Sequence, residues 1–405
     1  MNDTTPFVVC PEHHWYIKRN RVTADRICHD CKDVSSRLEV ALEKFSDEME
    51  DYYFANVQTS EEFAAKMKLR NMLEKILQNS SHGRDGWPKS VVVITGSSVT
   101  GLASKNSDVD ICVAIPDALA HFNSEIVAAR TCVKIMEYRL ADDEEFYNLV
   151  VKEKSGKPKL QFVDASIPVL KFTVLIDGFT IECDLSTACN REGFISSFHN
   201  SFLLRHYVKF DRRVAPLCFF IKKWAKNLEI YNPVEGRLNS YCLTLLVLHY
   251  LQCGLDPPLL PNFIQIYPSF FASTEQEFPQ VVDFDASLPW PVDDEPYNSL
   301  SMGQLFYGFI SYYNEFDFKA MSIDMKNACI NRKRVSNDRC RVLDIIDPID
   351  RHNPGRTLRR EGLEYIQGIL GSVREVFRNA ALNDDDVRDS LPPFNALLGE
   401  NQAFC

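Results

Sequence analysis

Hydrophobic residues in the first part of the chain recur at the spacing of an α-helix. Between residues 35 and 79 they fall every three to four positions, which places them along one helix face. The same repeat returns from about residue 197 onward, where most of the chain is predicted to be helical. The clearest helices predicted there span 214–227, 241–252 and 300–316.

The middle of the chain has the pattern of strands instead. A helix is predicted at 131–139 within this part. Two of the strands are separated by Asp177-Gly178, a dipeptide that favours a two-residue hairpin turn. Runs rich in β-branched and apolar residues predict strands over 91–95, 109–115, 169–176 and 179–185.

These patterns predict a mixed α/β domain followed by a mainly helical domain. The α/β domain, with a mixed sheet, is expected over residues 86–205 and the helical domain over 206–380. A helical segment over 35–85 is expected to pack on the helical domain. The polar ends of the chain are predicted to be a small Cys/His segment, 1–34, and a flexible tail, 381–405.

The composition is that of an ordinary globular protein with an acidic balance. Hydrophobic residues make up 45% of the 405 residues and charged residues 25%, enough apolar material for a core. Lysine and arginine number 45 against 56 aspartates and glutamates, a net charge of −11. Polyanion binding depends on cations, so any nucleic-acid contact must use a local basic surface or a protein partner. Two predicted loops are basic, one with Lys152, Lys154, Lys157 and Lys159, the other with Arg332, Lys333, Arg334, Arg339 and Arg341.

Thirteen cysteines without a secretory signal indicate a reducing compartment. The first ten residues lack the basic and apolar segments of a signal peptide. The longest apolar run, 241–251, is too short to cross a membrane and is predicted to be a buried helix. We therefore expect a soluble cytoplasmic protein, with a nuclear location left open.

Two carboxylates, Asp108 and Asp110, stand at the start of a predicted strand. Residues two apart on a strand face the same side, so both carboxylates are directed at one point. The apolar residues that follow, Ile111 and Val113, imply burial nearby, and two adjacent buried carboxylates repel unless a cation compensates. Oxygen ligands suit Mg²⁺ or Mn²⁺ better than Zn²⁺.

A third carboxylate and a Gly-Ser loop extend this pattern. Asp184 lies on the second strand of the predicted hairpin and can complete a metal cluster if that strand lies beside the strand of Asp108. Three carboxylates that hold two metal ions are the arrangement used for in-line nucleotidyl transfer. The loop at Gly96-Ser97 offers backbone N–H groups and a hydroxyl to a triphosphate, and glycine allows a close approach.

The stretch from Gly96 to Val113, GSSVTGLASKNSDVDICV, resembles the signature of the nucleotidyltransferases of the DNA polymerase β superfamily. Within it, the chain is similar to terminal uridylyltransferases and cytoplasmic poly(A) polymerases over residues 40–360. The resemblance implies a nucleotidyltransferase domain and a helical domain, with the active site in the cleft between them. It also implies template-independent addition of nucleotides to an RNA 3′ end, with two Mg²⁺ or Mn²⁺ ions bound by Asp108, Asp110 and Asp184.

Two motifs in the helical domain match the same family. Lys222 and Lys226 lie four residues apart on one helix face, where both can reach one triphosphate; a solvated helix face is the alternative. Ser240 is predicted to cap the following helix, and Tyr241, taken alone, fits a core aromatic. The resemblance implies that both lysines and Ser240 contact the triphosphate and that Tyr241 stacks on the base.

Residues 347–356, DPIDRHNPGR, resemble the nucleotide-recognition motif of the family. In its uridylyltransferases a histidine here reads the uracil edge, which implies that Asp347, Asp350 and His352 bind the nucleotide. The segment between Asp350 and His352 is one residue shorter than in those enzymes. We expect UTP as the substrate, with ATP as the alternative.

The N-terminal segment holds two closely spaced pairs, Cys10-x-x-His13 and Cys28-x-x-Cys31. Such pairs suit tetrahedral Zn²⁺, each supplying two ligands from a short turn. Reduced cysteines and scattered histidines in a loose N-terminus are the alternative, and His14 could replace His13.

The leading hypothesis is an RNA 3′-terminal uridylyltransferase, followed by a poly(A) polymerase. A catalytically inactive relative serving as an interaction platform is the third hypothesis; the presence of all three carboxylates and both lysines argues against it. A nucleotidyltransferase that acts on a small molecule is disfavoured by the helical-domain motifs. An RNA-binding protein partner is expected, because no known RNA-binding module is visible.

Overall fold

The computed structural model describes residues 7–9, 16–18, 36–79, 86–115, 118–189, 196–271, 288, 298–333 and 342–382. The chain divides into two compact units. One, called the sheet unit, comprises Asn56–His206 and Ser269–Pro289. The other, called the helical unit, comprises Met1–Ala55, Tyr207–Pro268 and Trp290–Cys405.

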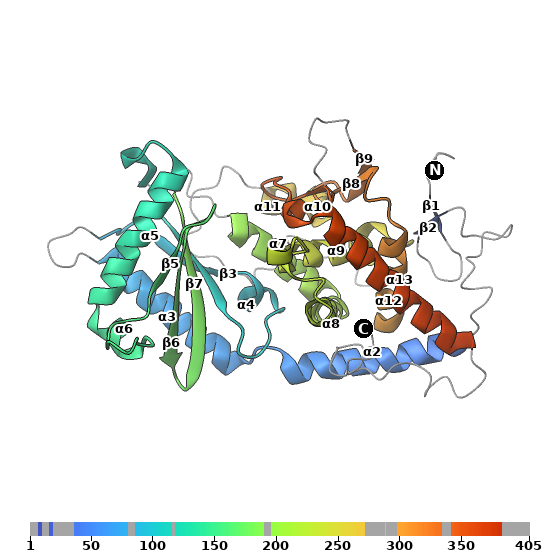
Figure 1. Cartoon of the computed structure of the whole chain (residues 1–405), viewed down its shortest axis with the longest axis horizontal. Helices are drawn as coiled ribbons and strands as arrows, with labels where there is room; N and C mark the ends of the chain where they lie inside the picture. The colour runs from blue at the N-terminus through green and yellow to red at the C-terminus, as the bar shows by residue number, and fades with distance from the viewer. Residues whose placement is uncertain are drawn as a thin grey trace. The chain divides into compact units, whose positions relative to one another are not determined.

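The sheet unit is built on five strands in the order β3-β4-β7-β6-β5 (Figure 1). Within this sheet the central pair, β4 and β7, runs parallel, and the other three pairs are antiparallel. The predicted mixed α/β fold and the strands expected from the sequence are therefore confirmed. The strands are β3 Val91–Thr95, β4 Val109–Ala114, β5 Gln161–Val163, β6 Val169–Ile176 and β7 Phe179–Ala188.

Two helices cover one face of this sheet. Alternate strand residues are apolar and point to the same side, where Ile111, Ile181 and Leu185 are fully or almost fully buried. Helices α3 (Ser60–Gln78) and α5 (Glu125–Asp142) pack on that side. The polar side chains of β4, β6 and β7 lie on the other face. The remaining elements of the unit are α4 Ser97–Thr100, η2 Ala118–His121, α6 Glu144–Leu149 and most of α7 Ser196–Phe210.

The β6–β7 hairpin turns at Asp177-Gly178, as predicted. Both residues have positive φ, 52° and 85°, which a type I′ turn requires. The pairing that follows from this turn brings Lys171 opposite Asp184. The turn thus determines which side chain of β6 stands beside the candidate metal ligand on β7.

The helical unit packs around an aromatic core. Phe45 and Phe220 meet edge to face with ring centres 5.3 Å apart, and Phe306 contacts both rings. No helix in the described ranges combines the length and apolarity that a bilayer crossing requires. The unit contains α2 Ser36–Asn56, α8 Val214–Asn227, η3 Pro233–Glu235, α9 Ser240–Cys253, α10 Phe263–Ile266, α12 Met302–Glu315, η4 Pro354–Thr357 and α13 Arg360–Leu382, with part of α11 Pro268–Phe271. Its strands are β1 Phe7–Val9, β2 Tyr16–Lys18, β8 Met321–Asp324, β9 Cys329–Arg332 and β10 Ile345–Ile346.

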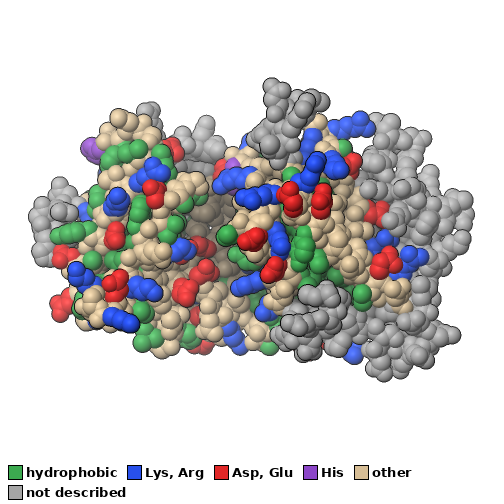
Figure 2. Space-filling view, viewed as in Figure 1, with side chains coloured by type: hydrophobic (Ala, Val, Ile, Leu, Met, Phe, Trp, Pro, Cys, Tyr) green, Lys and Arg blue, Asp and Glu red, His purple; other side chains and the backbone are tan. Residues whose placement is uncertain are grey.

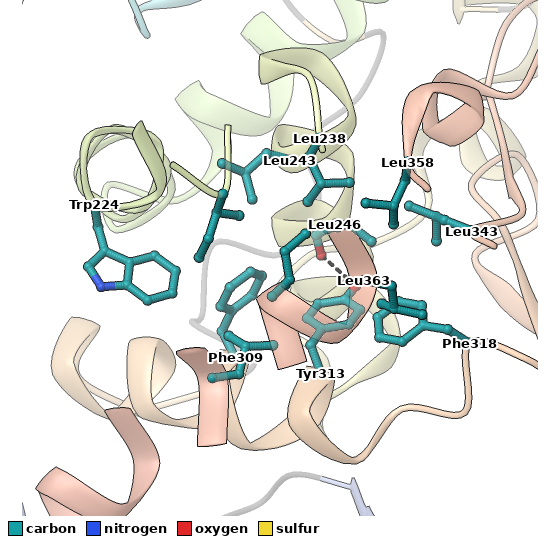
Figure 3. Close-up of a pocket in the computed structure, with 13 residues that line it drawn as sticks. Trp224, Leu238, Leu243, Leu246, Phe309, Tyr313, Phe318, Leu343, Leu358 and Leu363 are labelled. Carbon is teal, nitrogen blue, oxygen red and sulfur yellow. Dashed lines mark hydrogen bonds between the residues drawn. The ribbon is translucent and has the colours of Figure 1, made fainter. Parts of the chain in front are cut away.

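A small cavity lies among the helices of this unit (Figure 3). Its volume is about 30 Å³, room for about one water molecule. The lining side chains are apolar or aromatic, and the hydroxyl of Tyr313 donates to the carbonyl oxygen of Leu246 at 2.8 Å. The cavity is therefore a packing gap and is too small to hold a nucleotide.

Candidate functional site

Four polar side chains form a row across the sheet face that the helices leave open. Asp110 on β4 is in register with Asp184 on β7. Thr95 on β3 and Lys171 on β6 continue the row on either side. Neighbouring strands lie about 5 Å apart and residues in register face the same way, so the two carboxylates stand side by side. The expected proximity of these two strands is confirmed.

Asp108 and Asp110 are exposed, whereas the sequence pattern implied a buried pair. The apolar residues that suggested burial, Ile111 and Val113, point into the core beneath the helices. Since strand side chains alternate, their burial says nothing about the face that carries the carboxylates. The expectation of burial was wrong, and the exposed carboxylates are open to a cation from solvent.

Gly96, at the end of β3, lies directly against Asp110. Its φ is +72°, and a Cβ atom built there would lie 2.6 Å from Asp110 Oδ2. A side chain at position 96 would therefore collide with a candidate metal ligand. The N–H of Gly96 donates to Ser201 Oγ at 2.8 Å, so this donor is already used. Ser97 begins the one-turn helix α4 and is partly exposed.

Lys171 supplies a cation to this row that the sequence analysis missed. Its ammonium contacts a carboxylate oxygen of Asp184. Burial lowers the pKa of Lys171, but the hydrogen bond to Asp184 and the charges of Asp184, Asp108 and Asp110 outweigh burial and raise it. The charged lysine partly neutralises the carboxylates. The signal was available in the hairpin, because Lys171 lies six residues before Asp177 and Asp184 lies six residues after Gly178, which pairs them.

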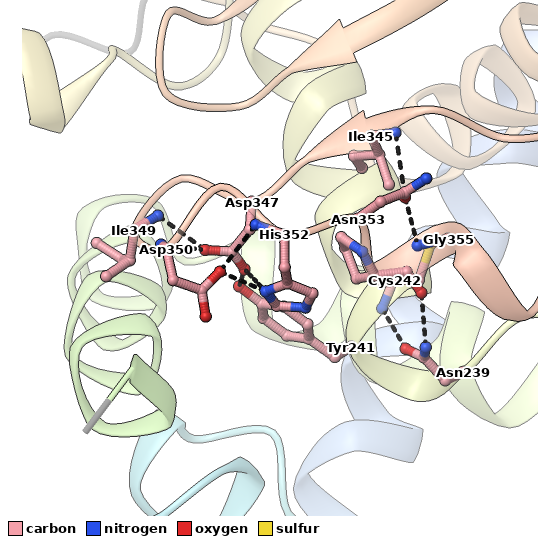
Figure 4. A network of polar contacts seen from close by, with 11 residues as sticks. Asn239, Tyr241, Cys242, Ile345, Asp347, Ile349, Asp350, His352, Asn353 and Gly355 are labelled. Atoms are coloured by element: carbon pink, nitrogen blue, oxygen red, sulfur yellow. Dashed lines mark hydrogen bonds and ion pairs between the residues drawn. The ribbon is translucent and has the colours of Figure 1, made fainter. Parts of the chain in front are cut away.

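In the helical unit, Tyr241 donates a hydrogen bond to Asp347 (Figure 4). The phenol oxygen lies 2.7 Å from Asp347 Oδ2, and Asp347 Oδ1 accepts the N–H groups of Ile349 and Asp350 at 2.8 and 3.1 Å. Burial raises the pKa of both Asp347 and Tyr241, and the charge of Asp347 raises that of Tyr241 further. Tyr241 therefore stays protonated and holds a fixed orientation.

His352 lies beside this pair despite the shortened segment before it. Its Nδ1 contacts the carboxylate of Asp350 and is 3.9 Å from Asp347 Oδ2. The N–H of Asp347 donates to the carbonyl oxygen of His352 at 2.9 Å, which closes the turn. Arg351 adopts a left-handed φ of 62° within it. That conformation lets the shorter segment complete the turn and gathers Asp347, Asp350 and His352.

Two sets of side chains can hold a divalent cation by their chemistry. In the helical unit, ligand atoms of Asp347, Asp350 and His352 lie within 4.8 Å of one another. The oxygens of Asp347 already accept three hydrogen bonds there, with which an ion would compete. The carboxylates of the sheet unit offer oxygens alone, which suit Mg²⁺ or Mn²⁺, while a histidine also suits other metals.

The N-cap of α9 is Asn239, not Ser240 as predicted. Asn239 Oδ1 accepts the N–H of Cys242 at 2.8 Å, and its Nδ2 donates to the carbonyl oxygen of Pro354 at 2.8 Å. One side chain thus caps the helix and anchors the loop that follows His352. The prediction of Ser240 is wrong because asparagine is as good an N-cap as serine and stands one residue earlier.

The other predicted nucleotide-binding side chains lie on two helices of the helical unit. Lys222 and Lys226 are one turn apart on α8, the first partly buried and the second exposed. Ser240 is partly buried in the first turn of α9. Their roles stay predictions. The predicted zinc ligands, Cys10, His13, Cys28 and Cys31, lie outside the described residues.

Comparison with known proteins finds relatives of this chain in sequence and in structure. Residues 45–209 match the sequence model of a family described as poly(A) RNA polymerase, mitochondrial-like, central palm domain. The poly(A) RNA polymerase GLD2 of Rattus norvegicus is 29% identical over 80% of this chain and 63% of its own length. GLD2-B of Xenopus laevis is 28% identical over 90% of this chain and 65% of its own length. The chain therefore spans less than two thirds of these relatives.

Solved structures of similar fold include RNA nucleotidyltransferases. The Cid1 poly(U) polymerase bound to Mg and 3′-dATP superposes with a TM-score of 0.65 at 25% identity, covering 89% of this chain and 99% of that one. The chain is thus similar to nucleotidyltransferases, over residues 45–209 by the family model and over most of its length by fold. A cytoplasmic RNA terminal U-transferase gives a TM-score of 0.64 at 26% identity, over 88% of this chain and 98% of the other. The resemblance seen at residues 96–113 is confirmed.

Proposed function

We propose that this nucleotidyltransferase adds uridylates from UTP to the 3′ end of RNA without a template. The observation that carries the proposal is the in-register pair Asp110 and Asp184, with Gly96 against Asp110. Paired carboxylates can bind the metal ions, and a glycine loop can bind the triphosphate, that metal-dependent nucleotidyl transfer requires.

In this reaction the 3′ hydroxyl of RNA attacks the α-phosphorus of the nucleotide, and pyrophosphate leaves. Asp108, Asp110 and Asp184 would hold two Mg²⁺ or Mn²⁺ ions, which activate the hydroxyl and stabilise charge on the transferring phosphate. The residues fit hard cations because every donor is a carboxylate oxygen. The contact of Lys171 with Asp184 supports this fit, because the cluster already attracts a cation.

The helical-unit residues would bind the nucleotide. Lys222 and Lys226 would neutralise the triphosphate, and Ser240 would add a hydroxyl donor. Tyr241, held by Asp347, would present its ring to the base. The charge-assisted contacts of the two lysines with the triphosphate would contribute about 1.5–3 kcal/mol each.

The preference for UTP is proposed from His352. Uracil offers O4 as an acceptor, whereas adenine offers an amino donor, so an imidazole N–H suits uracil. Cid1 structures are described as revealing a mechanism for UTP selectivity, and a histidine-to-asparagine variant of Cid1 was solved bound to MgATP. His352 occupies a turn that brings it beside Tyr241 and Asp347, which supports a similar role here.

A poly(A) polymerase is the second candidate function. The observation in its favour is that the GLD2 relatives, at 27–29% identity, are poly(A) RNA polymerases. Purified protein incubated with labelled RNA and each of the four nucleoside triphosphates separates the two. Preferred extension with UTP supports the first candidate, and preferred extension with ATP supports the second.

The same assay tests the metal ligands. Asp110→Ala and Asp184→Ala should each abolish extension while thermal unfolding stays cooperative, because each removes a proposed ion ligand from the sheet face that lies away from the core. If the wild-type protein extends RNA with none of the four nucleoside triphosphates, the proposed function is wrong. If either variant extends RNA at a near-normal rate, this ligand assignment is wrong.

We also propose a reducing, cytoplasmic setting, an RNA-binding protein partner and an N-terminal zinc site. The eight described cysteines are free thiols, which supports the reducing setting. Protein purified without chelator should contain about one zinc per chain, as a single tetrahedral site requires. The double variant Cys28→Ser with Cys31→Ser should lose that zinc. Absence of zinc from the wild-type protein would refute the proposed zinc site.

A further inference from the structure

Lys66 is a buried lysine beneath the segments that carry the candidate metal ligands. It lies on α3 in the sheet unit, and its side chain is 0% exposed. A buried ammonium is costly unless it is hydrogen-bonded. Its Nζ donates to Gln58 Oε1 at 2.7 Å, Ser107 Oγ at 3.1 Å, Ser98 Oγ at 3.2 Å and the carbonyl oxygen of Asp108 at 3.3 Å. It also forms an ion pair with Glu62 Oε1 at 3.6 Å.

Three of these partners, Ser98, Ser107 and Asp108, belong to two separate segments. Ser98 lies in α4, which directly follows Gly96. Ser107 and Asp108 lie in the segment that leads into β4. One ammonium therefore cross-links the glycine loop to the segment that presents the first carboxylate.

Two other polar side chains reinforce this cross-link. Glu62, one turn before Lys66, accepts the N–H of Asn106 at 3.0 Å, and Asn106 has a left-handed φ of 58°. Gln58 donates to the carbonyl oxygen of Ser98 at 3.1 Å. The start of the α3 region thus holds both segments through backbone groups as well as side chains.

The charge of Lys66 acts on the same region. Burial lowers its pKa, while Glu62, Asp108 and Asp110 oppose that shift. The Asp108 and Asp110 side chains are exposed, so water screens the influence of a distant charge on them. The hydrogen bonds of Lys66 are buried or partly buried, so water screens them less. Lys66 should therefore affect a bound cation more by fixing the position of the Asp108 segment than by its own charge.

We propose that Lys66 is a positioning residue for the metal ligands, joining the Ser98 and Ser107 segments and so setting Asp108 relative to Gly96. This inference rests on the proposed function, in which Asp108 is a metal ligand. Lys66 itself is enclosed by protein and would touch neither substrate nor ion.

Lys66→Met tests the proposal, because it keeps the length of the side chain and removes the ammonium. Lys68→Met is the matched control: it lies on the same helix, and its ammonium pairs with Asp177 at the hairpin turn. Mn²⁺ binding is measured by electron paramagnetic resonance without RNA or nucleotide. Extension kinetics give kcat, the KM for UTP and the Mg²⁺ concentration for half-maximal rate.

We expect Lys66→Met to weaken Mn²⁺ binding about 10- to 100-fold, as loss of a supporting partner of metal ligands does. The half-maximal Mg²⁺ concentration should rise in parallel, kcat should fall, and the KM for UTP should change little. Lys68→Met should match wild type in every measurement. Unchanged or tighter Mn²⁺ binding in folded Lys66→Met overturns the positioning role.

If Lys66→Met does not fold, the double variant Ser98→Ala with Ser107→Ala replaces it, since it removes two partners and keeps the ammonium. It should weaken Mn²⁺ binding in the same direction, and wild-type binding would overturn the proposal. Because Mn²⁺ binding is read without RNA, a wild-type protein that binds Mn²⁺ but extends no RNA would refute the proposed function and leave this inference separately testable.

Discussion

At the scale of single residues, Gly96 has little room for a side chain. Its φ is positive, and a Cβ built there would lie 2.6 Å from Asp110 Oδ2, so both the backbone conformation and the contact disfavour a side chain. Gly96→Ala should therefore displace the carboxylate, and extension should fall at least about 100-fold, as misplacement of a catalytic group by 1 Å can cause. The measurement is kcat/KM for extension, together with the free energy of unfolding.

Gly156→Ala is the control for backbone strain alone. Gly156 has a similar φ of +80°, but a Cβ there meets nothing within 4 Å. It should cost about 1–2 kcal/mol of stability through the left-handed conformation and leave extension unchanged. Equal losses of activity in the two variants would show that strain, and not contact with Asp110, makes Gly96 necessary.

The contact between His352 and Asp350 bears on base choice. With Nδ1 directed at Asp350, the ring presents Nε2 as its other polar atom. His352→Ala should narrow the ratio of kcat/KM for UTP over ATP about tenfold, the loss expected for one hydrogen bond that discriminates between bases. Asp350→Ala should narrow it less, because the ring remains but loses its orientation. If both variants keep the wild-type ratio of kcat/KM for UTP over ATP, other residues select the base.

Between elements, a buried histidine joins α9 to α12. His249 Nδ1 lies 2.8 Å from the hydroxyl of Tyr313, and that hydroxyl donates its proton to the carbonyl oxygen of Leu246. The histidine must therefore donate from Nδ1, which leaves Nε2 unprotonated. Burial lowers the pKa of His249 to about 3.

This helix contact should weaken in acid. The unfolded chain binds a proton at His249 near pH 6.5, whereas the folded chain does so near 3, so stability is present above 6.5 and is lost as pH falls toward 3. The slope from this residue is about 1.4 kcal/mol per pH unit. Urea unfolding between pH 6 and 4.5 should show a shallower slope in His249→Gln than in wild type. Identical slopes would contradict the prediction.

For the molecule as a whole, the net charge is acidic, and both signs are mixed on the face seen in Figure 2. Figure 2 shows lysine and arginine interspersed with aspartate and glutamate on the face in view. Together with the net charge of −11, this predicts weak affinity for RNA, with a Kd no tighter than about 10⁻⁶ M at physiological salt. Fluorescence anisotropy with a labelled RNA across a salt series measures it. Nanomolar binding by the isolated chain would contradict the prediction.

Local patterns were enough for most elements. The β-branched run 91–95 and the Asp177-Gly178 turn predicted strand and hairpin correctly, because both depend on a few consecutive residues. The helix at 214–227 was predicted at its observed bounds. The cap of α9 was assigned to the wrong residue because Asn239 and Ser240 can both cap, and the contact of Asn239 with Pro354, more than 100 residues away, is not a local property.

The amino-acid order was sufficient to predict the carboxylates, the glycine loop and the resemblance to nucleotidyltransferases, because residue type and short spacing carry that chemistry. The burial of these groups depended on which face of the sheet the helices cover, and that choice belongs to packing. The same holds for Lys66 and Lys171, whose partners are remote in the chain or lie across a strand pair. A lysine in a sequence looks solvated until folding encloses it, since its surroundings come from segments that only the folded chain brings together.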